Sequence, residues 1–177
     1  MSVHFITGSK NKFEEIRAIL GDVEQLEIDL PEIQELDAHK IIRAKLDEAL
    51  KHRTGAFMVE DTSLYFDALH GLPGPLIKWF MKTIDCEGLF KILEPFGNYG
   101  AEAKTIIGYT NGSGDLQFFE GSVRGTIVSP RGETGFGWDI IFQPEGKTDT
   151  FAEMSAEEKN SISMRRLAAE KLKAYLG

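Results

Sequence analysis

The spacing of apolar positions predicts alternating strands and helices over the first third of the chain. A short apolar run at 3–6 predicts a strand, and residues 13–20 carry apolar side chains at helical spacing. A second strand is expected at 25–30 and a second helix at 38–51. The continuous apolar run 56–59 is typical of a strand covered on both faces. This order predicts an α/β fold with a mixed sheet.

The rest of the chain predicts more strands than helices. A hairpin is expected where residues 103–110 and 116–123 flank the turn sequence Asn-Gly-Ser-Gly-Asp, with a further strand at 125–128. A turn at 70–75 precedes a helix through residues 77–81, and 87–96 predicts another short helix. The last helix, with Ser155 and Glu158 as a capping box, is expected to run to about Leu176.

Composition narrows the class of protein. The 177 residues contain no linker or repeat, so we expect a single domain, residues 1–177. A net charge of -8 repels polyanions, so binding to nucleic acid or to an anionic membrane is not expected. Cys86 is the only cysteine, which permits no internal disulfide. With no apolar leader and no membrane-length run, we expect a cytoplasmic protein.

The turn after the first strand is the strongest chemical signal. Thr7-Gly8-Ser9-Lys10-Asn11-Lys12 connects it directly to a helix, whose first backbone N–H groups point into the turn. Lys10 and Lys12 lie at the positive end of the helix dipole, where cations are disfavoured. An anion in the turn would explain both lysines, and phosphate is the usual one.

Carboxylates follow two of the expected strands. Glu32 follows the second strand, and Asp61 comes directly after the buried strand. Ligands of open α/β sheets bind beyond such strand ends, and oxygen ligands suit Mg²⁺. We therefore expect Glu32 and Asp61 to bind metal, whereas Glu60 and Glu35 are equally well explained as solvent-facing or capping acids. Lys45 lies at the edge of an apolar helix stripe, where it either extends to water or reaches the phosphate turn.

Two further groups point to a nucleotide. The expected start of the last helix carries three cations, again against the dipole preference: Lys159, Arg165 and Arg166. A glycine-rich loop carries Phe136 and Trp138 with Asp139 behind them. Aromatic faces stack on bases, and Phe136 between two glycines is the better candidate, because Trp138 also fits a core position.

Five ordered blocks over essentially the whole chain resemble the inosine triphosphate pyrophosphatase family: TGSKNKFEEI, LPEIQE, VEDTSLYFDALHGLPGPLIKWF, FGWDIIF and FAEMSAEEKNSISMRR. The resemblance implies an elongated mixed β-sheet flanked by helices, with two lobes around a central nucleotide-binding cleft, and a homodimer. It also implies Mg²⁺-dependent hydrolysis of ITP, dITP and XTP to the monophosphate and pyrophosphate, which removes deaminated purines from the nucleotide pool.

The resemblance also implies roles for single residues. The triphosphate would be bound by Thr7, Ser9, Lys12 and Lys45. The metal would be held by Glu32 and Asp61, which with Lys12 form the catalytic set, and Asp61 would orient or deprotonate the attacking water. Phe136 would stack on the base. The nucleoside pocket would be lined by Trp138, Asp139, Lys159, Ser163 and Arg165.

Two positions depart from the family pattern. Ser9 stands where the family usually has Asn, and its hydroxyl can still bond a phosphate or the helix start. Ser163-Met164-Arg165 replaces the family's Ser-His-Arg, which removes an imidazole near the base and loosens or alters selectivity. Two alternatives therefore stay open: a pyrophosphatase of the same fold that prefers another modified nucleotide, and a non-catalytic nucleotide-binding sensor.

Overall fold

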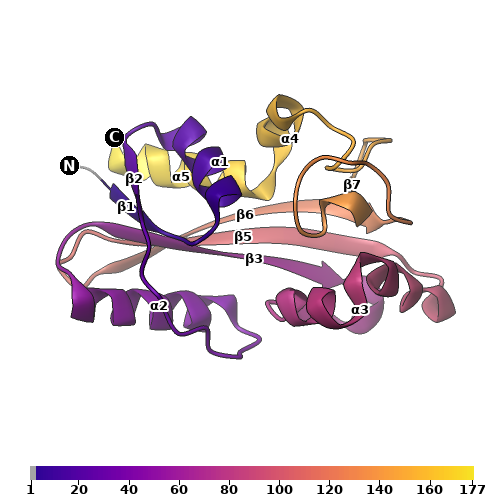
Figure 1. The fold of residues 1–177 in the computed structure, drawn as a ribbon, viewed down its shortest axis with the longest axis horizontal. Coiled ribbons are helices and arrows are strands. Elements are labelled where there is room, and N and C mark those ends of the chain that lie inside the picture. The colour runs from indigo at the N-terminus through magenta and orange to yellow at the C-terminus, as the bar shows by residue number, and fades with distance from the viewer. Residues whose placement is uncertain (1–2) are drawn as a thin grey trace. The chain divides into compact units, whose positions relative to one another are not determined.

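A computed structural model describes residues 3–177 and contains an open mixed sheet flanked by helices (Figure 1). Its strands are β1 Val3–Ile6, β2 Val23–Leu26, β3 Phe57–Phe66, β4 Pro73–Gly74, β5 Gly100–Thr110, β6 Leu116–Ile127 and β7 Phe142–Pro144. The order is β2-β1-β3-β5-β6-β7, with β4 on β3. β1 pairs in parallel with β2 and β3, whereas β4 and β7 pair antiparallel. The predicted α/β class with a mixed sheet is confirmed.

The helices are α1 Lys10–Leu20, α2 Ala38–His52, α3 Ile77–Lys91, α4 Ala156–Ile162 and α5 Met164–Leu176. The chain forms two compact units, each built from separate segments. Unit 1 comprises the chain up to Thr62 together with Thr105–Gly121 and Met164–Gly177; unit 2 comprises Ser63–Lys104 and Ser122–Ser163. The prediction of a single domain over residues 1–177 stays a prediction.

Several predicted boundaries were wrong. The second strand is β2 at Val23–Leu26 rather than 25–30, and its four residues pair one by one with the four residues of β1. The short helix predicted at 87–96 is present as a separate helical segment, because the non-helical backbone of Asp85 (φ 53°, ψ -170°) divides α3. Its end was predicted too late, since α3 ends at Lys91 and a 3-10 helix follows at Glu94–Phe96. The last helix divides at Ser163, whose extended backbone (φ -69°, ψ 152°) ends α4 before α5 begins.

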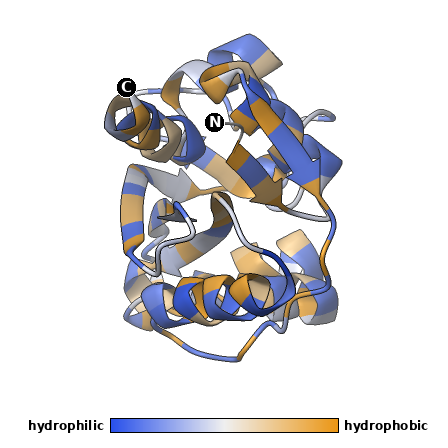
Figure 2. Ribbon diagram, turned by 90° about the vertical axis from the view of Figure 1, so that its left-hand side faces the viewer, coloured by the Kyte–Doolittle hydropathy of each residue, from blue (hydrophilic) through white to orange (hydrophobic). Residues whose placement is uncertain are grey.

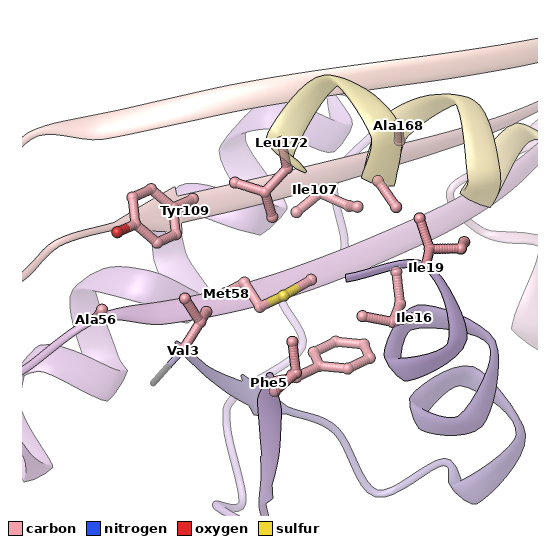
Figure 3. Packing of buried hydrophobic residues seen from close by; sticks show 12 residues of the cluster. Val3, Phe5, Ile16, Ile19, Ala56, Met58, Ile107, Tyr109, Ala168 and Leu172 are labelled. Atoms are coloured by element: carbon pink, nitrogen blue, oxygen red, sulfur yellow. The ribbon is translucent and has the colours of Figure 1, made fainter. Parts of the chain in front are cut away.

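In unit 1, helices cover both faces of the sheet. α1 and α5 pack on one face around Phe5 and Met58, as the close view of this cluster shows (Figure 3). α2 covers the other face, where it packs against Phe57 and Val59. Consecutive residues of β3 thus alternate between the two clusters, as the pleat of a strand requires.

The helices of unit 1 are amphipathic, and their ribbons carry both hydrophobic and hydrophilic stretches (Figure 2). The predicted stripe of α2 is buried at its apolar positions, which are Ala38, Ile41, Ile42, Leu46 and Ala49. Within residues 3–177, no helix combines the length and the apolar character needed to cross a membrane.

Gly121 of β6 determines how closely α5 approaches the sheet. A Cβ atom at this position would lie 2.6 Å from the backbone nitrogen of Ala168 and would also contact the carbonyl oxygen of Met164. The first turn of α5 therefore packs on bare backbone, and this contact fixes the position from which Arg165 projects.

We predict that Gly121→Ala destabilises the protein by about 1–3 kcal/mol, because backbone atoms cannot yield to the added methyl group. Urea unfolding measures this difference. Gly8→Ala is the matched control, since a Cβ atom at Gly8 meets nothing within 4 Å. Equal stability of the two variants would contradict the close approach of α5.

Candidate active site

The turn between β1 and α1 is held in shape by its own hydroxyl groups. Ser9 caps the helix, and its Oγ accepts a hydrogen bond from the Lys12 backbone N–H at 3.4 Å. The Thr7 Oγ1 accepts one from the Ser9 N–H at 3.1 Å. Gly8 is exposed, and a Cβ atom added at this position would meet nothing within 4 Å. The turn thus presents a helix N-terminus with room for a ligand, as an anion site needs.

The two lysines of this turn have different surroundings. The Lys10 side chain is 84% exposed and pairs with Glu14 of its own helix at 3.8 Å. The Lys12 side chain is 29% exposed, and its Nζ lies 2.6 Å from Oε1 of Glu60 on β3. Lys12 is therefore anchored to the sheet, and Lys10 is not.

Lys12 belongs to a group of five polar side chains, which we call the Glu60 cluster: Lys12, Glu15, Glu60, Thr62 and Arg165. The Arg165 Nε donates to Oε2 of Glu60 at 2.8 Å, and its Nη1 donates to Glu15. Its Nη2 donates to the Thr62 hydroxyl at 3.3 Å. The contact of Lys12 with Oε1 of Glu60 is a close ion pair outside ordinary hydrogen-bond angles. α1, β3 and α5 all contribute to this cluster.

Glu60 and Arg165 both keep their charges around neutral pH. Burial by itself raises the pKa of Glu60, but the charges of Arg165 and Lys12 outweigh it and lower that pKa to about 2. Burial likewise opposes the charge of Arg165, yet Glu60 and Glu15 raise its pKa above the ordinary value. Glu60 is thus a permanent carboxylate and is unsuited to accept a proton in catalysis.

The three cations expected at one helix start do not form one group, and that prediction was wrong. Lys159 lies in the last turn of α4 in unit 2, whereas Arg165 and Arg166 begin α5 in unit 1. Arg166 pairs with Glu170 at 2.7 Å. The physical cause is the extended backbone at Ser163, which separates the two helices.

Asp61, Glu32 and Lys45 are the other residues of unit 1 that were predicted to bind metal or phosphate. Asp61 follows Glu60 on β3, so its side chain points to the opposite face of the sheet, the face that α2 covers. Lys45 of α2 pairs with Glu32 at 3.5 Å. Glu32 is exposed and lies in the irregular segment between β2 and α2.

The carboxylates of the described chain offer few ligands for Mg²⁺. Within residues 3–177, no three His, Cys, Asp or Glu side chains form a group that could hold a metal ion. Mg²⁺ needs only one or two carboxylates when phosphate and water oxygens complete its shell. Glu32 and Asp61 supply two carboxylates, although Glu32 also pairs with Lys45, and metal binding by the two stays a prediction. Glu60 does not fit as a further ligand, because Lys12 and Arg165 already neutralise its carboxylate.

In unit 2, Asp139 organises the aromatic loop. Its Oδ2 accepts a hydrogen bond from the Phe136 backbone N–H at 2.9 Å and pairs with Lys159 Nζ at 2.6 Å. Gly135 and Gly137 flank Phe136 in left-handed backbone conformations (φ 78° and 64°). The same Lys159 Nζ lies 4.4 Å from the centre of the Phe136 ring, a cation–π distance. The half-buried ring is therefore held in place from one side.

The other predicted nucleoside residues of unit 2 are buried. Trp138 is 6% exposed and packs edge-on against Phe142 at 5.5 Å between ring centres, which confirms its interpretation as a core residue. The Ser163 N–H donates to the carbonyl of Lys159 at 2.9 Å and closes α4. Contact of these residues, or of Arg165, with a nucleoside stays a prediction.

Sequence reasoning missed Glu15 and Thr62 and left Glu60 undecided. Glu15 lies three residues after Lys12, on the same side of α1, and this spacing was the one available signal. The shared hydrogen-bond partner of these residues is Arg165, which lies 150 positions beyond Glu15 in the chain. No local pattern reports such a pairing.

Comparison with known proteins identifies what the chain is similar to. A family model described as "Ham1 family" matches residues 3–175. The inosine triphosphate pyrophosphatase of Schizosaccharomyces pombe is 42% identical, over 99% of this chain and 95% of that protein. The protein of the same name from Emericella nidulans is 46% identical, over 99% and 96%.

Solved structures agree with this result. The structure of the Staphylococcus aureus Ham1 protein matches with a TM-score of 0.84 at 24% identity. The match covers 99% of this chain and 98% of that protein's chain. A nucleoside-triphosphatase / dITP/XTP pyrophosphatase from Mycobacterium abscessus has a TM-score of 0.74 at 28% identity, with 99% of both chains covered.

We predict that Glu60 supports folding in a pH-dependent way. Because its pKa falls from 4.5 to about 2 on folding, its stabilisation is complete above pH 4.5 and is lost as the pH falls towards 2. Urea unfolding between about pH 2 and 7 measures the free energy of unfolding at each pH. Between pH 4.5 and 2, this free energy should fall less in Glu60→Gln than in the unchanged protein, by on the order of 3 kcal/mol.

Glu157→Gln, at an exposed position, is the matched control. Its free energy of unfolding should fall at low pH as much as that of the unchanged protein. An identical pH profile for Glu60→Gln and the unchanged protein would contradict the charge pairing of Glu60.

Proposed function

The chain belongs to the Ham1 family, and on that premise we propose that it hydrolyses ITP, dITP and XTP to the monophosphate and pyrophosphate. One observation carries the proposal: Lys12, anchored by Glu60 at 2.6 Å, lies at the N-terminus of α1 beside the open turn at Gly8. A fixed cation and free helix N–H groups are what a polyphosphate tail needs. The names of the relatives supply the choice of nucleotide.

The phosphate tail is proposed to bind the turn of unit 1. Thr7 and Ser9 shape the turn through their hydroxyl groups, and Lys12 neutralises phosphate charge. Lys45 is proposed to contact a phosphate as well, since its side chain is 11% exposed and its partner Glu32 is an acid proposed to bind metal. A net charge of -8 keeps the proposal to small phosphorylated ligands rather than nucleic acid.

Glu32 and Asp61 are proposed to hold Mg²⁺, which would supply charge neutralisation and orientation of phosphate oxygens when bound. Water attacks the α-phosphorus, the bond to the pyrophosphate group breaks, and pyrophosphate leaves. Asp61 orients this water or takes its proton. Glu60, with a pKa of about 2, is a poor proton acceptor.

In unit 2, Phe136 is proposed to stack on the purine through the ring face away from Lys159. Trp138, Asp139, Lys159 and Ser163 of the same unit are proposed to line the nucleoside pocket. Arg165 belongs to unit 1, and its contact with a nucleoside stays a prediction. Donors aimed at a 6-keto oxygen would meet the amino group of adenine as a mismatch. Such mismatches discriminate by up to about 10⁴.

We also propose a cytoplasmic homodimer. Leu72 and Trp79, in the segment 72–81, are 41% and 47% exposed, and their apolar surface supports an interface between two copies. Sedimentation at micromolar concentration tests this assembly.

A second candidate function rests on Met164, which is 2% exposed at the start of α5. A buried thioether offers no hydrogen-bond donor where the family has an imidazole. This favours a pyrophosphatase of the same fold with a different preference among modified nucleotides. A non-catalytic nucleotide sensor is the remaining alternative.

We predict that pyrophosphate release with Mg²⁺ is at least about 100-fold faster from ITP, dITP and XTP than from ATP, because adenine lacks the 6-keto oxygen. Asp61→Asn should lower kcat for ITP by about 10²–10⁴. Asp115→Asn, in the exposed turn between β5 and β6, is the matched control.

Equal turnover of ATP and ITP would remove the proposed substrate preference. Full activity of Asp61→Asn would contradict its assignment, and tight nucleotide binding without turnover would favour the sensor.

We predict that Met164→His raises the preference for ITP over other nucleotides about 5- to 10-fold, the effect of one added hydrogen bond. Met164→Leu, which keeps an apolar side chain of similar volume, is the control. The ratio of kcat/KM values for a panel of modified purine triphosphates measures the change. Unchanged ratios in Met164→His would argue against a role for this position in base choice.

A further inference from the structure

We propose that Glu60, Thr62 and Arg165 form a positioning relay that holds the Lys12 ammonium in place for the polyphosphate tail. Arg165 acts through Glu60, and Glu60 acts directly on Lys12. The inference rests on the proposed function, since it assumes that Lys12 meets phosphate. It assigns roles in unit 1 to two residues, Glu60 and Thr62, that sequence patterns left without one.

Exposure within the Glu60 cluster runs in one direction. The side chains of Glu60 and Arg165 are 1% and 2% exposed, Glu15 is 13% exposed, and Lys12 is 29% exposed. Among the four charged members, Lys12 is the one that a dissolved anion reaches most readily. Glu60, as a buried member, therefore influences a bound phosphate chiefly through Lys12.

The location of Lys12 explains why it needs such support. It lies in the first turn of α1, where the helix dipole repels a cation. Glu60 supplies the compensating negative charge 2.6 Å away. A phosphate can take over part of that compensation, because it also favours a helix N-terminus. The arrangement holds a cation where the helix alone would disfavour it, ready for an anion.

Arg165 fixes Glu60 from the inner side. Its Nε bonds Oε2 of Glu60 at 2.8 Å, while Glu15 and Thr62 hold the rest of the guanidinium group. Replacing buried ion pairs with apolar side chains often leaves stability equal or improved. Stability alone therefore does not account for two cations and two carboxylates at this place. The arrangement is accounted for if Arg165, Glu60 and Glu15 together hold Lys12 in position.

Thr62 helps to orient the buried Arg165 and Glu60 side chains. Its hydroxyl accepts from Arg165, and it shares a 2.8 Å hydrogen bond with the buried Thr105 hydroxyl in either direction. With Thr105 as donor, the proton of Thr62 is directed to Oε2 of Glu60 at 3.5 Å. Thr62 is thus a neutral residue whose removal loosens Glu60 without altering any charge.

A double-mutant cycle tests the relay. The measurement is the affinity of the whole protein for inorganic tripolyphosphate, which has neither base nor sugar, by calorimetry without added metal. Lys12→Met and Glu60→Gln should each weaken binding about 10-fold or more. The double variant should bind no more weakly than Lys12→Met, because Glu60 acts through Lys12.

Thr62→Val provides a second route in case Glu60→Gln does not fold. It should weaken tripolyphosphate binding about 3- to 10-fold. Thr62→Ser, which keeps the hydroxyl, should restore it. The effect of Thr62→Val should vanish in the Lys12→Met background. Lys10→Met removes an equal charge from the same helix start and should cost less than about 3-fold, since Lys10 is solvent-screened.

Additive losses in the cycle would overturn the relay. So would the absence of tripolyphosphate binding, or unaltered binding by Lys12→Met, since nothing would then remain to be positioned. The proposed function can fail on its own. If ITP releases no pyrophosphate but the losses in the cycle are non-additive, the proposed reaction is wrong and the relay stands. Release from ITP with additive losses removes the relay and leaves the reaction.

Discussion

The ion pairs of Glu60 are the interaction on which the candidate site of unit 1 depends. A carboxylate with 1% of its side chain exposed is costly to bury unless cations compensate it. Arg165 and Lys12 supply that compensation from two different helices. The charge requirement of one strand residue thus ties α1 and α5 to β3, and it fixes the cation that faces the turn.

Close backbone packing makes this pairing feasible. α5 lies against β6 at Gly121, where a side chain would meet the backbone of Met164 and Ala168. At that distance, Arg165 reaches Glu60, Glu15 and Thr62 together. A glycine with no chemistry of its own therefore determines the geometry of the charged group.

Unit 2 uses the same principle on a smaller scale. Asp139 binds both a backbone N–H of its own loop and the ammonium group of Lys159. The loop around Phe136 is fixed by one carboxylate, while two glycines permit its left-handed turns. In each unit, a buried acid organises the residues that are proposed to meet the ligand.

The sequence by itself determined the fold class and the turn before α1. It also predicted residues that bind phosphate and metal, and those assignments stay predictions. Hydrophobic periodicity and the residues at helix ends are local features, so they can be recognised from the sequence alone. The hairpin around 111–115 and the extent of α2 were predicted for the same reason, and both are confirmed. The division of the last helix was missed because one extended residue, Ser163, leaves no periodic signal.

Only the tertiary structure decided which charges meet. Lys10 and Lys12 look alike in the sequence, yet only Lys12 contacts the buried carboxylate, because the helix turns one side chain to the sheet and the other to solvent. Arg165 is predicted from the sequence to meet a ligand, and the structure adds two partners that the sequence did not show, Glu60 and Glu15. Electrostatic pairing acts through space, so residues far apart in the chain settle it, and no pattern of neighbours encodes it.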